Sequence, residues 1–512
     1  MLVKTFGAAV QGINATIVTI EVNVSQGIRF MHVGLPDNAV KESRERITSA
    51  LGCTGNKMPH KQVVINMAPA DIRKEGSAYD LPLAIGILAA DEKIACDELE
   101  KYVIMGELSL DGGLQPIKGV LPIAIKAREE GFKGFILPKQ NAREAAVVNN
   151  LDVYGVENIT EVIDFFNGKS TLEPTVVNTR DEFFSHLNLS EIDFADVKGQ
   201  ESVKRALEVA AAGGHNIIMV GPPGAGKSML AKRIPTILPP LTLQEALETT
   251  KIHSVAGNID SNTSLISQRP FRSPHHTISD VALVGGGTFP QPGEISLAHN
   301  GVLFLDELPE FKRTVLEVMR QPLEDRKICI SRAKFAIEYP ASFMLVASMN
   351  PCPCGYYNHP DRACVCAPGV VQKYLSRISG PLLDRIDIHI EIVPVPFEKL
   401  SEMKDSESST VVRDRVMKAR QIQEQRFKDI DGVYCNAQMS SKQMREFAQI
   451  DKAGSELLKN AMQRLNLSAR AYDRIIKVAR TIADLDNAEH ILSNHIAEAI
   501  NYRNLDREGW AG

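Results

Sequence analysis

The chain is organised around the stretch Asn216-Ile217-Ile218-Met219-Val220-Gly221-Pro222-Pro223-Gly224-Ala225-Gly226-Lys227-Ser228. Its first five residues are mostly apolar and β-branched, which is typical of a buried strand. Residues 229–234, directly after it, have the pattern of a helix. Strand, G-x-x-x-x-G-K-S and helix together are the context that a phosphate-binding loop requires. A glycine-rich turn without this role is the alternative, and the flanking strand and helix disfavour it.

Each residue type in this loop has a chemical reason. Glycines let successive backbone N–H groups curve around a polyphosphate without Cβ clashes. The helix that follows points its unpaired N-terminal donors at the same anion. Lys227 supplies a positive charge to the outer phosphates, and Ser228 supplies a hydroxyl ligand for Mg²⁺. We therefore predict that ATP and Mg²⁺ bind at Gly221, Pro222, Pro223, Gly224, Ala225, Gly226, Lys227 and Ser228.

Two later apolar runs end in polar residues. The run Gly301–Leu305 ends in Asp306 and Glu307, and the run Phe343–Met349 ends in Asn350. A carboxylate at the end of a buried strand beside the loop can hold Mg²⁺, and a second one can deprotonate the attacking water. We predict Asp306 as the metal partner and Glu307 as the base. Asn350 is predicted either to contact the γ-phosphate or the lytic water, or to cap a turn.

Composition bounds the class of protein. A chain of 512 residues with 44% apolar and 24% charged residues has room for about three domains and is typical of a soluble globular protein. No apolar run approaches ~18 residues and no signal peptide is evident, so we expect a cytoplasmic protein without membrane contact. The net charge of −5 gives no global sign of nucleic-acid binding, so such a surface would have to be a local patch or channel.

Four of the eight cysteines cluster in sequence: Cys352, Cys354, Cys364 and Cys366. Four thiolates suit tetrahedral Zn²⁺, although the usual spacing is C-x-x-C and not C-x-C. His359 could replace one ligand. Reduced thiols without metal remain the alternative. Two adjacent histidines, His275 and His276, could bind metal or could form hydrogen bonds within a loop. We favour the hydrogen-bonding role.

Residues 1–167 mix strands and helices without a phosphate loop. The segment Gly106–Ile117, with Lys74-Glu75-Gly76-Ser77-Ala78 upstream, resembles the proteolytic domain of Lon proteases, which use a serine–lysine pair. The match puts Ala78 at the serine position and Leu121 at the lysine position. Ser77 and Lys118 lie close by in the sequence, so a shifted alignment stays open. We expect an inactive Lon-like fold.

The rest of the chain carries a hairpin, a candidate arginine and a helical end. Residues 326–340 alternate as a hairpin with a basic tip from Arg332 to Lys334. Arg385 follows a Leu-Leu-Asp turn, where an arginine can pair locally or reach the ATP of a neighbouring subunit. Residues 411–501 are mainly helical, and Arg470 lies near the start of a helix capped by Ser468.

Phosphate loop, Asp-Glu strand, polar strand end, Leu-Leu-Asp-Arg and an arginine in a helical lid together resemble an AAA+ ATPase. The hairpin before Asn350, the Lon-like segment and the Cys-x-Cys pairs narrow the resemblance to the magnesium-chelatase-like family of the ComM/YifB type, over essentially the whole chain. This resemblance implies an α/β fold with a Lon-like α+β domain at 1–167, a linker at 168–190, an AAA+ domain at 191–395 and a helical lid at 396–512.

The resemblance also implies roles and partners. Gly221–Ser228 are implied as Walker A, Asp306 and Glu307 as Walker B, Asn350 as sensor 1, Arg385 as arginine finger and Arg470 as sensor 2. It further implies a hexameric ring that moves single-stranded or branched DNA in recombination or natural transformation. Two other functions stay open: a motor subunit that drives Mg²⁺ into a porphyrin, and an ATP-dependent protein remodeller or protease.

Overall fold

The structure is a computed structural model that describes residues 1–180, 183, 192–287, 290–332, 335–357, 359, 362–395, 406–430, 432–465, 467–503 and 505. Contacts divide the chain into two compact units. The first combines Met1–Leu187 with Thr242–Ser267, and the second combines Asn188–Leu241 with Gln268–Gly512. The sequence-based boundaries put residues 242–267 in the ATPase domain. The contacts group them with the first unit, because the helix in this segment packs there.

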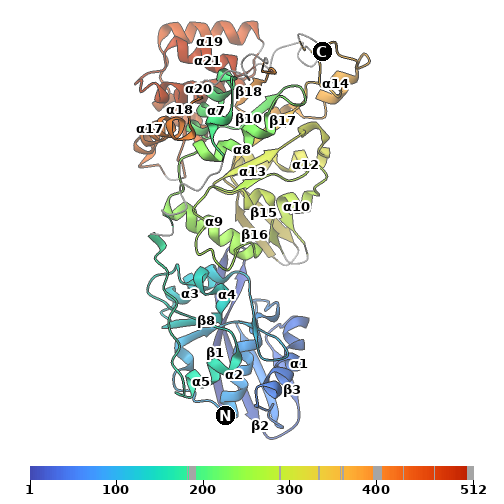
Figure 1. The fold of residues 1–512 in the computed structure, drawn as a ribbon, viewed down its shortest axis with the longest axis vertical. Helices are drawn as coiled ribbons and strands as arrows, with labels where there is room; N and C mark the ends of the chain where they lie inside the picture. The colour runs from blue at the N-terminus through green and yellow to red at the C-terminus, as the bar shows by residue number, and fades with distance from the viewer. Residues whose placement is uncertain are drawn as a thin grey trace. The chain divides into compact units, whose positions relative to one another are not determined.

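The first unit contains a seven-stranded sheet (Figure 1). Its strands are β1 (Leu2–Gln11), β2 (Asn14–Ser25), β3 (Phe30–Val33), β4 (Gln62–Ala68), β5 (Tyr102–Ile104), β8 (Gly134–Pro138) and β9 (Asp152–Val156), with a separate pair β6 (Glu107–Leu108) and β7 (Leu114–Gln115). The sheet order is β3-β4-β2-β1-β5-β8-β9. β2 is antiparallel to both β1 and β4, whereas β1, β5, β8 and β9 run parallel.

The helices of this unit are α1 (Asn38–Cys53), α2 (Asp80–Ala90), α3 (Val120–Glu129), α4 (Lys139–Ala145), α5 (Ile159–Phe166) and α9 (Leu243–Ala256), with short 3-10 helices η1 (Ser77–Tyr79) and η2 (Leu99–Lys101). Every residue of α2 is buried, as its apolar sequence predicts. A capping box of Thr242 and Glu245 starts α9, and a left-handed Gly257 ends it.

Helix α9 packs against α3 through backbone as well as side chains. The N–H of Gly119 donates to the carbonyl of Ser254 (3.0 Å), and the N–H of Leu121 donates to the Ser254 hydroxyl (3.4 Å). Leu121 also donates to the buried carboxyl of Glu144 (3.0 Å). These bonds satisfy free N–H groups at the start of α3, so α9 contributes directly to the local structure of the first unit.

The second unit contains a five-stranded sheet of β10 (Ile217–Val220), β11 (Phe271–Arg272), β14 (Val302–Leu305), β17 (Met344–Met349) and β18 (Ile388–Glu391). The order is β11-β14-β17-β10-β18, and all neighbours are parallel. β10, β14 and β17 are fully buried, which fits their unbroken apolar sequences. Parallel strands end at one edge, so the residues after β10, β14 and β17 meet there.

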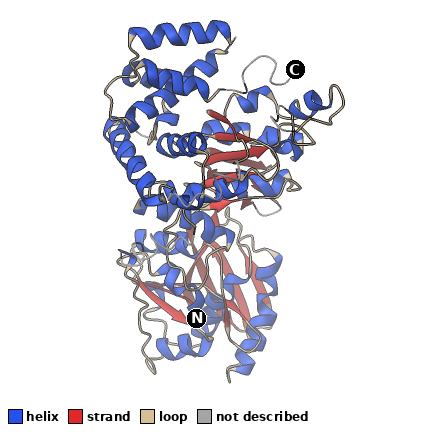
Figure 2. Cartoon of the chain, turned by 45° about the horizontal axis from the view of Figure 1, so that its top comes forward, coloured by secondary structure: helices blue, strands red, loops and turns tan. Residues whose placement is uncertain are grey.

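Helices flank this sheet (Figure 2). They are α7 (Glu201–Gly213), α8 (Lys227–Ile237), α10 (Asp280–Val284), α11 (Glu294–Leu297), α12 (Arg313–Val318), α13 (Arg320–Asp325), α14 (Val370–Leu375) and α15 (Gly380–Leu383), with 3-10 helices η3 (Phe194–Asp196) and η4 (Leu308–Glu310). Two hairpins complete the region: β12 (Gly285–Gly286) with β13 (Gln291–Pro292), and β15 (Lys327–Arg332) with β16 (Phe335–Pro340). The second is the hairpin that the sequence predicted.

The C-terminal part of the unit is helical: α17 (Ser409–Phe427), α18 (Ser441–Phe447), α19 (Lys452–Arg464), α20 (Ala469–Leu485) and α21 (Ser493–Asn501), with the 3-10 helix η5 (Asn436–Gln438). Helices α17 and α20 both pack against α7. Ser468 caps α20 by accepting from the N–H of Ala471 (3.1 Å), as expected. The core of the sheet and that of these helices form one apolar cluster. The AAA+-type α/β architecture inferred from the sequence fits this arrangement of parallel sheet and helices.

Candidate active site

The predicted phosphate loop lies between β10 and α8. Gly224 and Gly226 have φ angles of +79° and +85°, which side chains other than glycine rarely adopt. Gly221 approaches the chain so closely that a Cβ there would sit 2.6 Å from the carbonyl oxygen of Ile392. The backbone conformation at Gly224 and Gly226, and the close approach of the chain at Gly221, therefore require glycine. Gly226 is also the N-cap of α8, whose first residue is Lys227.

Lys227 lies at the centre of the loop. Its Nζ donates to the carbonyls of Gly221 (2.7 Å) and Pro222 (2.9 Å) and to Oδ1 of Asn350 (3.0 Å). Burial lowers the pKa of Lys227, and the charges of Asp306 and Glu307 oppose that shift. Through this hydrogen bond, the residue that follows β17 contacts the loop that follows β10.

Asp306 follows β14 at the same edge of the sheet. Its Oδ2 accepts a hydrogen bond from the hydroxyl of Ser228 (2.7 Å), and its Oδ1 accepts one from the hydroxyl of Ser348. The two predicted Mg²⁺ partners, Ser228 and Asp306, are thus adjacent side chains. Hydroxyl and carboxylate oxygens are the ligands that Mg²⁺ takes in such sites.

Glu307 is more exposed than Asp306, and its backbone is unusual. Its φ of +52° is left-handed, a conformation that costs about 1–3 kcal/mol for a non-glycine residue and clusters at functional sites. The Oε2 atom lies 3.6 Å from Nδ1 of His276. The His276 ring in turn lies against the rings of His275 (4.1 Å) and Phe311 (6.4 Å). His276 therefore lies beside the predicted base, and no metal cluster among the described residues includes either histidine.

Arg385 lies at the other edge of the sheet. The N–H groups of Asp387 and Ile388 both donate to the carbonyl of Asn216 (3.0 Å), so this turn is level with the start of β10. Five residues from Asn216 to Val220, at about 3.3 Å each, put roughly 15 Å between that level and the phosphate loop.

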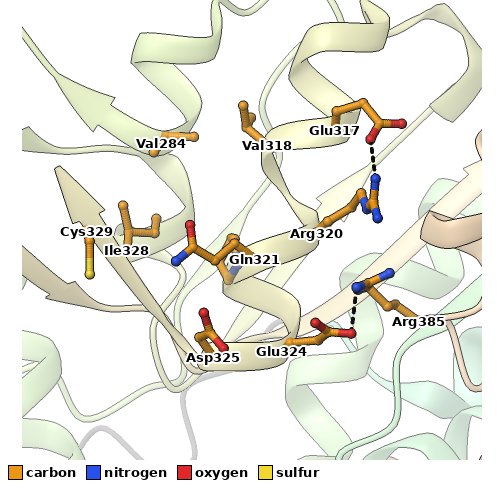
Figure 3. A pocket seen from close by; sticks show the side chains of 11 residues that line it. Val284, Glu317, Val318, Arg320, Gln321, Glu324, Asp325, Ile328, Cys329 and Arg385 are labelled. Atoms are coloured by element: carbon orange, nitrogen blue, oxygen red, sulfur yellow. Dashed lines mark hydrogen bonds and ion pairs between the residues drawn. The ribbon is translucent and has the colours of Figure 1, made fainter. Parts of the chain in front are cut away.

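The guanidinium of Arg385 is buried and paired within its own chain. It donates to Oε1 of Glu324 (2.6 Å) and to the carbonyl of Pro381 (2.5 Å), and the residue is 7% exposed. Figure 3 shows the two side chains pointing at one another beside a cavity of about 470 Å³. The cavity is lined by α13 and the start of β15, so it is separate from the phosphate loop.

Arg470 is close to Arg385 and not to the loop of its own chain. Its Nη1 lies 3.4 Å from Oδ2 of Asp384, the residue before Arg385, and its side chain is 61% exposed. One turn further along α20, Arg474 pairs with the buried Asp387 (2.9 Å). The structure therefore places Arg470 beside Asp384, and a contact of Arg470 with the nucleotide stays a prediction.

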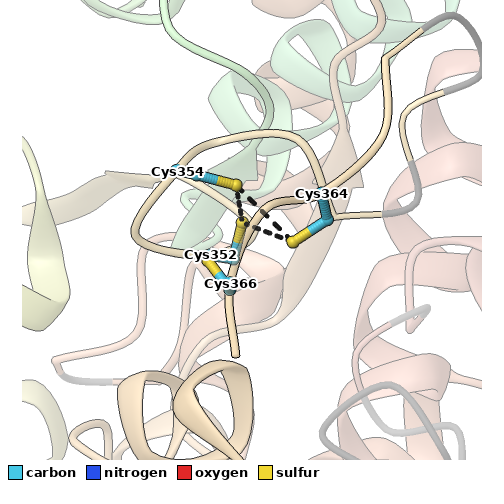
Figure 4. Close-up of side chains that lie close together, drawn as sticks. All are labelled: Cys352, Cys354, Cys364 and Cys366. Atoms are coloured by element: carbon cyan, nitrogen blue, oxygen red, sulfur yellow. Dashed lines mark hydrogen bonds between the residues drawn. The ribbon is translucent and has the colours of Figure 1, made fainter. Parts of the chain in front are cut away.

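The four clustered cysteines come together in space. Their sulfur atoms lie within 4.8 Å of one another, and all four are free thiols (Figure 4). His359 instead stacks its ring edge against Tyr356 at 5.6 Å. The predicted basic tip of the β15–β16 hairpin lies largely outside the described residues, because Lys334 and the side chain of Arg332 are not among them.

The Lon-like residues show no serine–lysine pair. Ala78 and Leu121 occupy the matched positions. The Ser77 hydroxyl donates to the Glu107 carboxylate, while the Lys118 side chain lies against Gly257. The two side chains of the shifted alignment thus have separate neighbours.

We therefore expect the full-length protein to cleave no peptide bond, because the Ser77 hydroxyl pairs with a carboxylate and not with the lysine amine that a serine–lysine pair requires. The measurement is casein degradation with and without ATP, compared with that of the Ser77→Ala variant. ATP-stimulated cleavage that disappears in Ser77→Ala would show that the shifted alignment is the right one.

Several neighbours of the site escaped sequence reasoning. Ser348, His276 and Glu324 contact Asp306, Glu307 and Arg385, respectively. The role of Ser348 could have been found from the sequence, since Ser348 is the polar residue inside an otherwise apolar buried strand and shares a face with Asn350. The roles of His276 and Glu324 could not, because their contacts join distant parts of the sequence.

No helix in the described part of the chain is long and apolar enough to span a bilayer. Three family models match: "Magnesium chelatase, subunit ChlI" over residues 193–400, "Subunit ChlI of Mg-chelatase" over 20–141, and "Magnesium chelatase, subunit ChlI C-terminal" over 406–503. A 159-residue stretch is 33% identical to Lon protease 2 of Bacillus subtilis, covering 28% of this chain and 27% of that protein.

Two relatives match nearly end to end. Competence protein ComM of Haemophilus influenzae is 44% identical over 508 residues, which cover 99% of this chain and 98% of that protein. Protein YifB of Escherichia coli is 44% identical over 504 residues, covering 98% and 96%. A parallel α/β sheet with a phosphate loop accompanies this similarity. The chain therefore belongs to the magnesium-chelatase-like family of AAA+ ATPases that contains ComM and YifB, and this membership implies ATPase activity with ATP and Mg²⁺.

Proposed function

We propose that this protein is a hexameric AAA+ motor that hydrolyses ATP and moves single-stranded or branched DNA in the cytoplasm. In this proposal it acts as a helicase or branch-migration factor in recombination or natural transformation. Lys227 and Ser228 hold the phosphates and Mg²⁺ with Asp306, Glu307 activates the attacking water, and Asn350 orients it. The name of the relative ComM, a competence protein, supports the biological setting.

The observation that carries the proposal is the position of Arg385. It lies level with the start of β10, whereas the phosphate loop follows the end of that strand. For Arg385 to stabilise charge on the transferred phosphoryl group, the nucleotide has to be held by the loop of another chain. Arg470 lies beside Asp384 on the same side, so both arginines are suited to a neighbour's nucleotide.

Completion of the site by a neighbour favours a ring. The loop follows the end of β10 and Arg385 lies level with the start of that strand, so a contact that joins the two between chains is head-to-tail. Head-to-tail contacts give either a closed ring or an open filament. The number six comes from the resemblance to AAA+ motors. In such an assembly Arg385 has to exchange Glu324 for the nucleotide, because one guanidinium cannot satisfy both with full geometry.

The β15–β16 hairpin is the proposed DNA-contacting element. Arg332 and Lys334 lie at or beside its turn in the sequence, and the strands are held in register from Lys327↔Pro340 to Arg332↔Phe335. Phosphate contacts from such a tip would be independent of base sequence and sensitive to salt. A net charge of −5 fits contacts confined to a channel.

The proposal is tested by ATPase rates measured with branched, single-stranded and duplex DNA. We expect DNA to stimulate hydrolysis in the wild type, and the double variant Arg332→Ala/Lys334→Ala to lose this stimulation while basal hydrolysis remains. The slope of log affinity against log salt should fall by about one for each lost phosphate contact. Lys327→Ala is the matched control, because Lys327 pairs with Glu338 (3.0 Å) at the hairpin base.

Two other outcomes would overturn the proposal. Stimulation by unfolded protein and not by DNA would favour a protein remodeller. ATP hydrolysis that responds to neither DNA nor unfolded protein, but depends on a porphyrin-binding partner, would favour a chelatase motor. The magnesium-chelatase 38 kDa subunit of Cereibacter sphaeroides is 24% identical over 177 residues, which cover 31% of this chain and 52% of that protein. This similarity is the observation that favours the chelatase alternative.

A further inference from the structure

The cysteines after β17 have the geometry of a metal site. The Sγ atoms of Cys352 and Cys354 are 3.3 Å apart, those of Cys354 and Cys364 are 3.5 Å apart, and those of Cys352 and Cys364 are 3.8 Å apart. A zinc ion with Zn–S bonds of about 2.3 Å in a tetrahedron separates its sulfur ligands by about 3.8 Å. One of these separations equals that value and two are shorter by up to 0.5 Å, while all four sulfur atoms, that of Cys366 included, lie within 4.8 Å of one another.

The donor set selects the kind of ion. Thiolates favour Zn²⁺ over Mg²⁺ or Ca²⁺, which prefer oxygen ligands. Backbone N–H groups of Tyr356 and Val365 also donate to the sulfur of Cys354. Such donors orient a thiolate from outside the ligand set, as supporting hydrogen bonds do around metal ligands generally. Four ligands without an open position are typical of a structural site and not of a catalytic one.

The cysteine segment also touches the ATP site. Cys352 follows Asn350 by two residues, and Asn350 contacts Nζ of Lys227. Gly355, next to Cys354, has a φ of +85° and packs on Pro223 of the phosphate loop. A Cβ on Gly355 would lie 2.5 Å from Cδ of Pro223, closer than real atoms approach. The segment from Asn350 to Gly355 therefore contacts the loop at both of its ends.

We propose that Cys352, Cys354, Cys364 and Cys366 bind one structural Zn²⁺ ion, and that this ion holds the Asn350–Gly355 segment against the phosphate loop. The four cysteines form no disulfide, so the ion would supply the cross-link that joins the Asn350–Gly355 segment to Cys364 and Cys366. Nucleotide affinity then depends on zinc. This dependence concerns the ATP site alone and holds whether or not the protein acts on DNA.

The first experiment is metal analysis of full-length protein purified without chelator. We expect about one zinc ion per chain. Native protein should leave the four clustered thiols unreactive until a mercurial displaces zinc. Cys53→Ser is the matched control, because Cys53 is exposed and remote in sequence from the cluster. Absence of zinc, with the clustered thiols freely titratable or joined in disulfides, would overturn the metal site.

The second experiment separates the ion from the contact that it supports. Zinc removal should weaken the affinity for a fluorescent ATP analogue by between about tenfold and 100-fold, the effect of misplacing a binding group by up to 1 Å, and added zinc should restore it. Gly355→Ala keeps all four cysteines, so we expect full zinc content and a similar loss of affinity. Unchanged affinity in zinc-loaded Gly355→Ala would overturn the supporting role even if zinc-free protein fails to fold.

Discussion

Purified Glu307→Gln protein is expected to bind ATP with near-normal affinity and to hydrolyse it roughly 10²–10⁴-fold more slowly than the wild type, the usual contribution of a general base. The amide keeps the size of the side chain and removes its basicity. The backbone of Glu307 is left-handed, its N–H donates to Oδ1 of Asp306 (3.0 Å), and its carboxylate lies 3.6 Å from Nδ1 of His276. The measurement is steady-state phosphate release together with equilibrium ATP binding.

Two variants frame this result. Lys227→Ala should lose tight ATP binding, because Nζ is the only ammonium group that the described structure brings to the loop. Glu310→Gln is the matched carboxylate control: Glu310 lies three residues further on and pairs with Arg377 at 3.0 Å on the surface. Near-normal turnover in Glu307→Gln would refute the assignment of the base.

Arg385→Ala protein is expected to be nearly inactive alone and to regain hydrolysis when mixed with Glu307→Gln protein. An arginine that stabilises the transferred phosphoryl group contributes roughly 10³–10⁵-fold to the rate. In a mixed assembly, the intact loop and base of an Arg385→Ala chain meet the intact arginine of a Glu307→Gln chain. Some interfaces are then complete although neither chain is.

The control mixture is Lys227→Ala with Glu307→Gln. Both changes lie at the carboxyl edge of the sheet, so no interface in that mixture is complete and no activity should return. Full activity of the wild type as a monomer, at micromolar concentration with ATP and DNA, would contradict the shared site. The shared site would also be contradicted if the mixture of Arg385→Ala and Glu307→Gln proteins hydrolysed ATP no faster than the sum of the two proteins measured separately.

The central ATP site could be predicted from sequence because its signals are local. Each of its parts is a short apolar strand followed by polar residues, and parallel strands bring such ends together without further information. Lys227 accordingly contacts Asn350 (3.0 Å), and Ser228 contacts Asp306 (2.7 Å). The hairpin and the Ser468 cap were also local patterns and were found.

What the sequence did not reveal depends on contacts between distant segments. Nothing in the residues of α9 distinguishes a helix that packs on the ATPase sheet from one that packs on α3. Arg470 has the position in sequence of a nucleotide contact, and the sequence does not show whether its side chain lies beside Asp384, as it does here, or elsewhere. The register of the lid helices decides that choice, and a single sequence does not reveal such a register.

Helix α9 also decides how this protein can be divided. Its neighbours in sequence, α8 and β11, belong to the second unit, yet Ser254 bonds to Gly119 and Leu121 in the first. A fragment of residues 188–512 would carry α9 without its partner, and a fragment of residues 1–187 would leave the buried N–H of Gly119 without its acceptor, the carbonyl of Ser254. Leaving a buried polar group without its partner costs about 1–3 kcal/mol. Each unit is made of two separate segments of the sequence. A deletion or fusion that keeps both units intact therefore needs more than one cut in the chain.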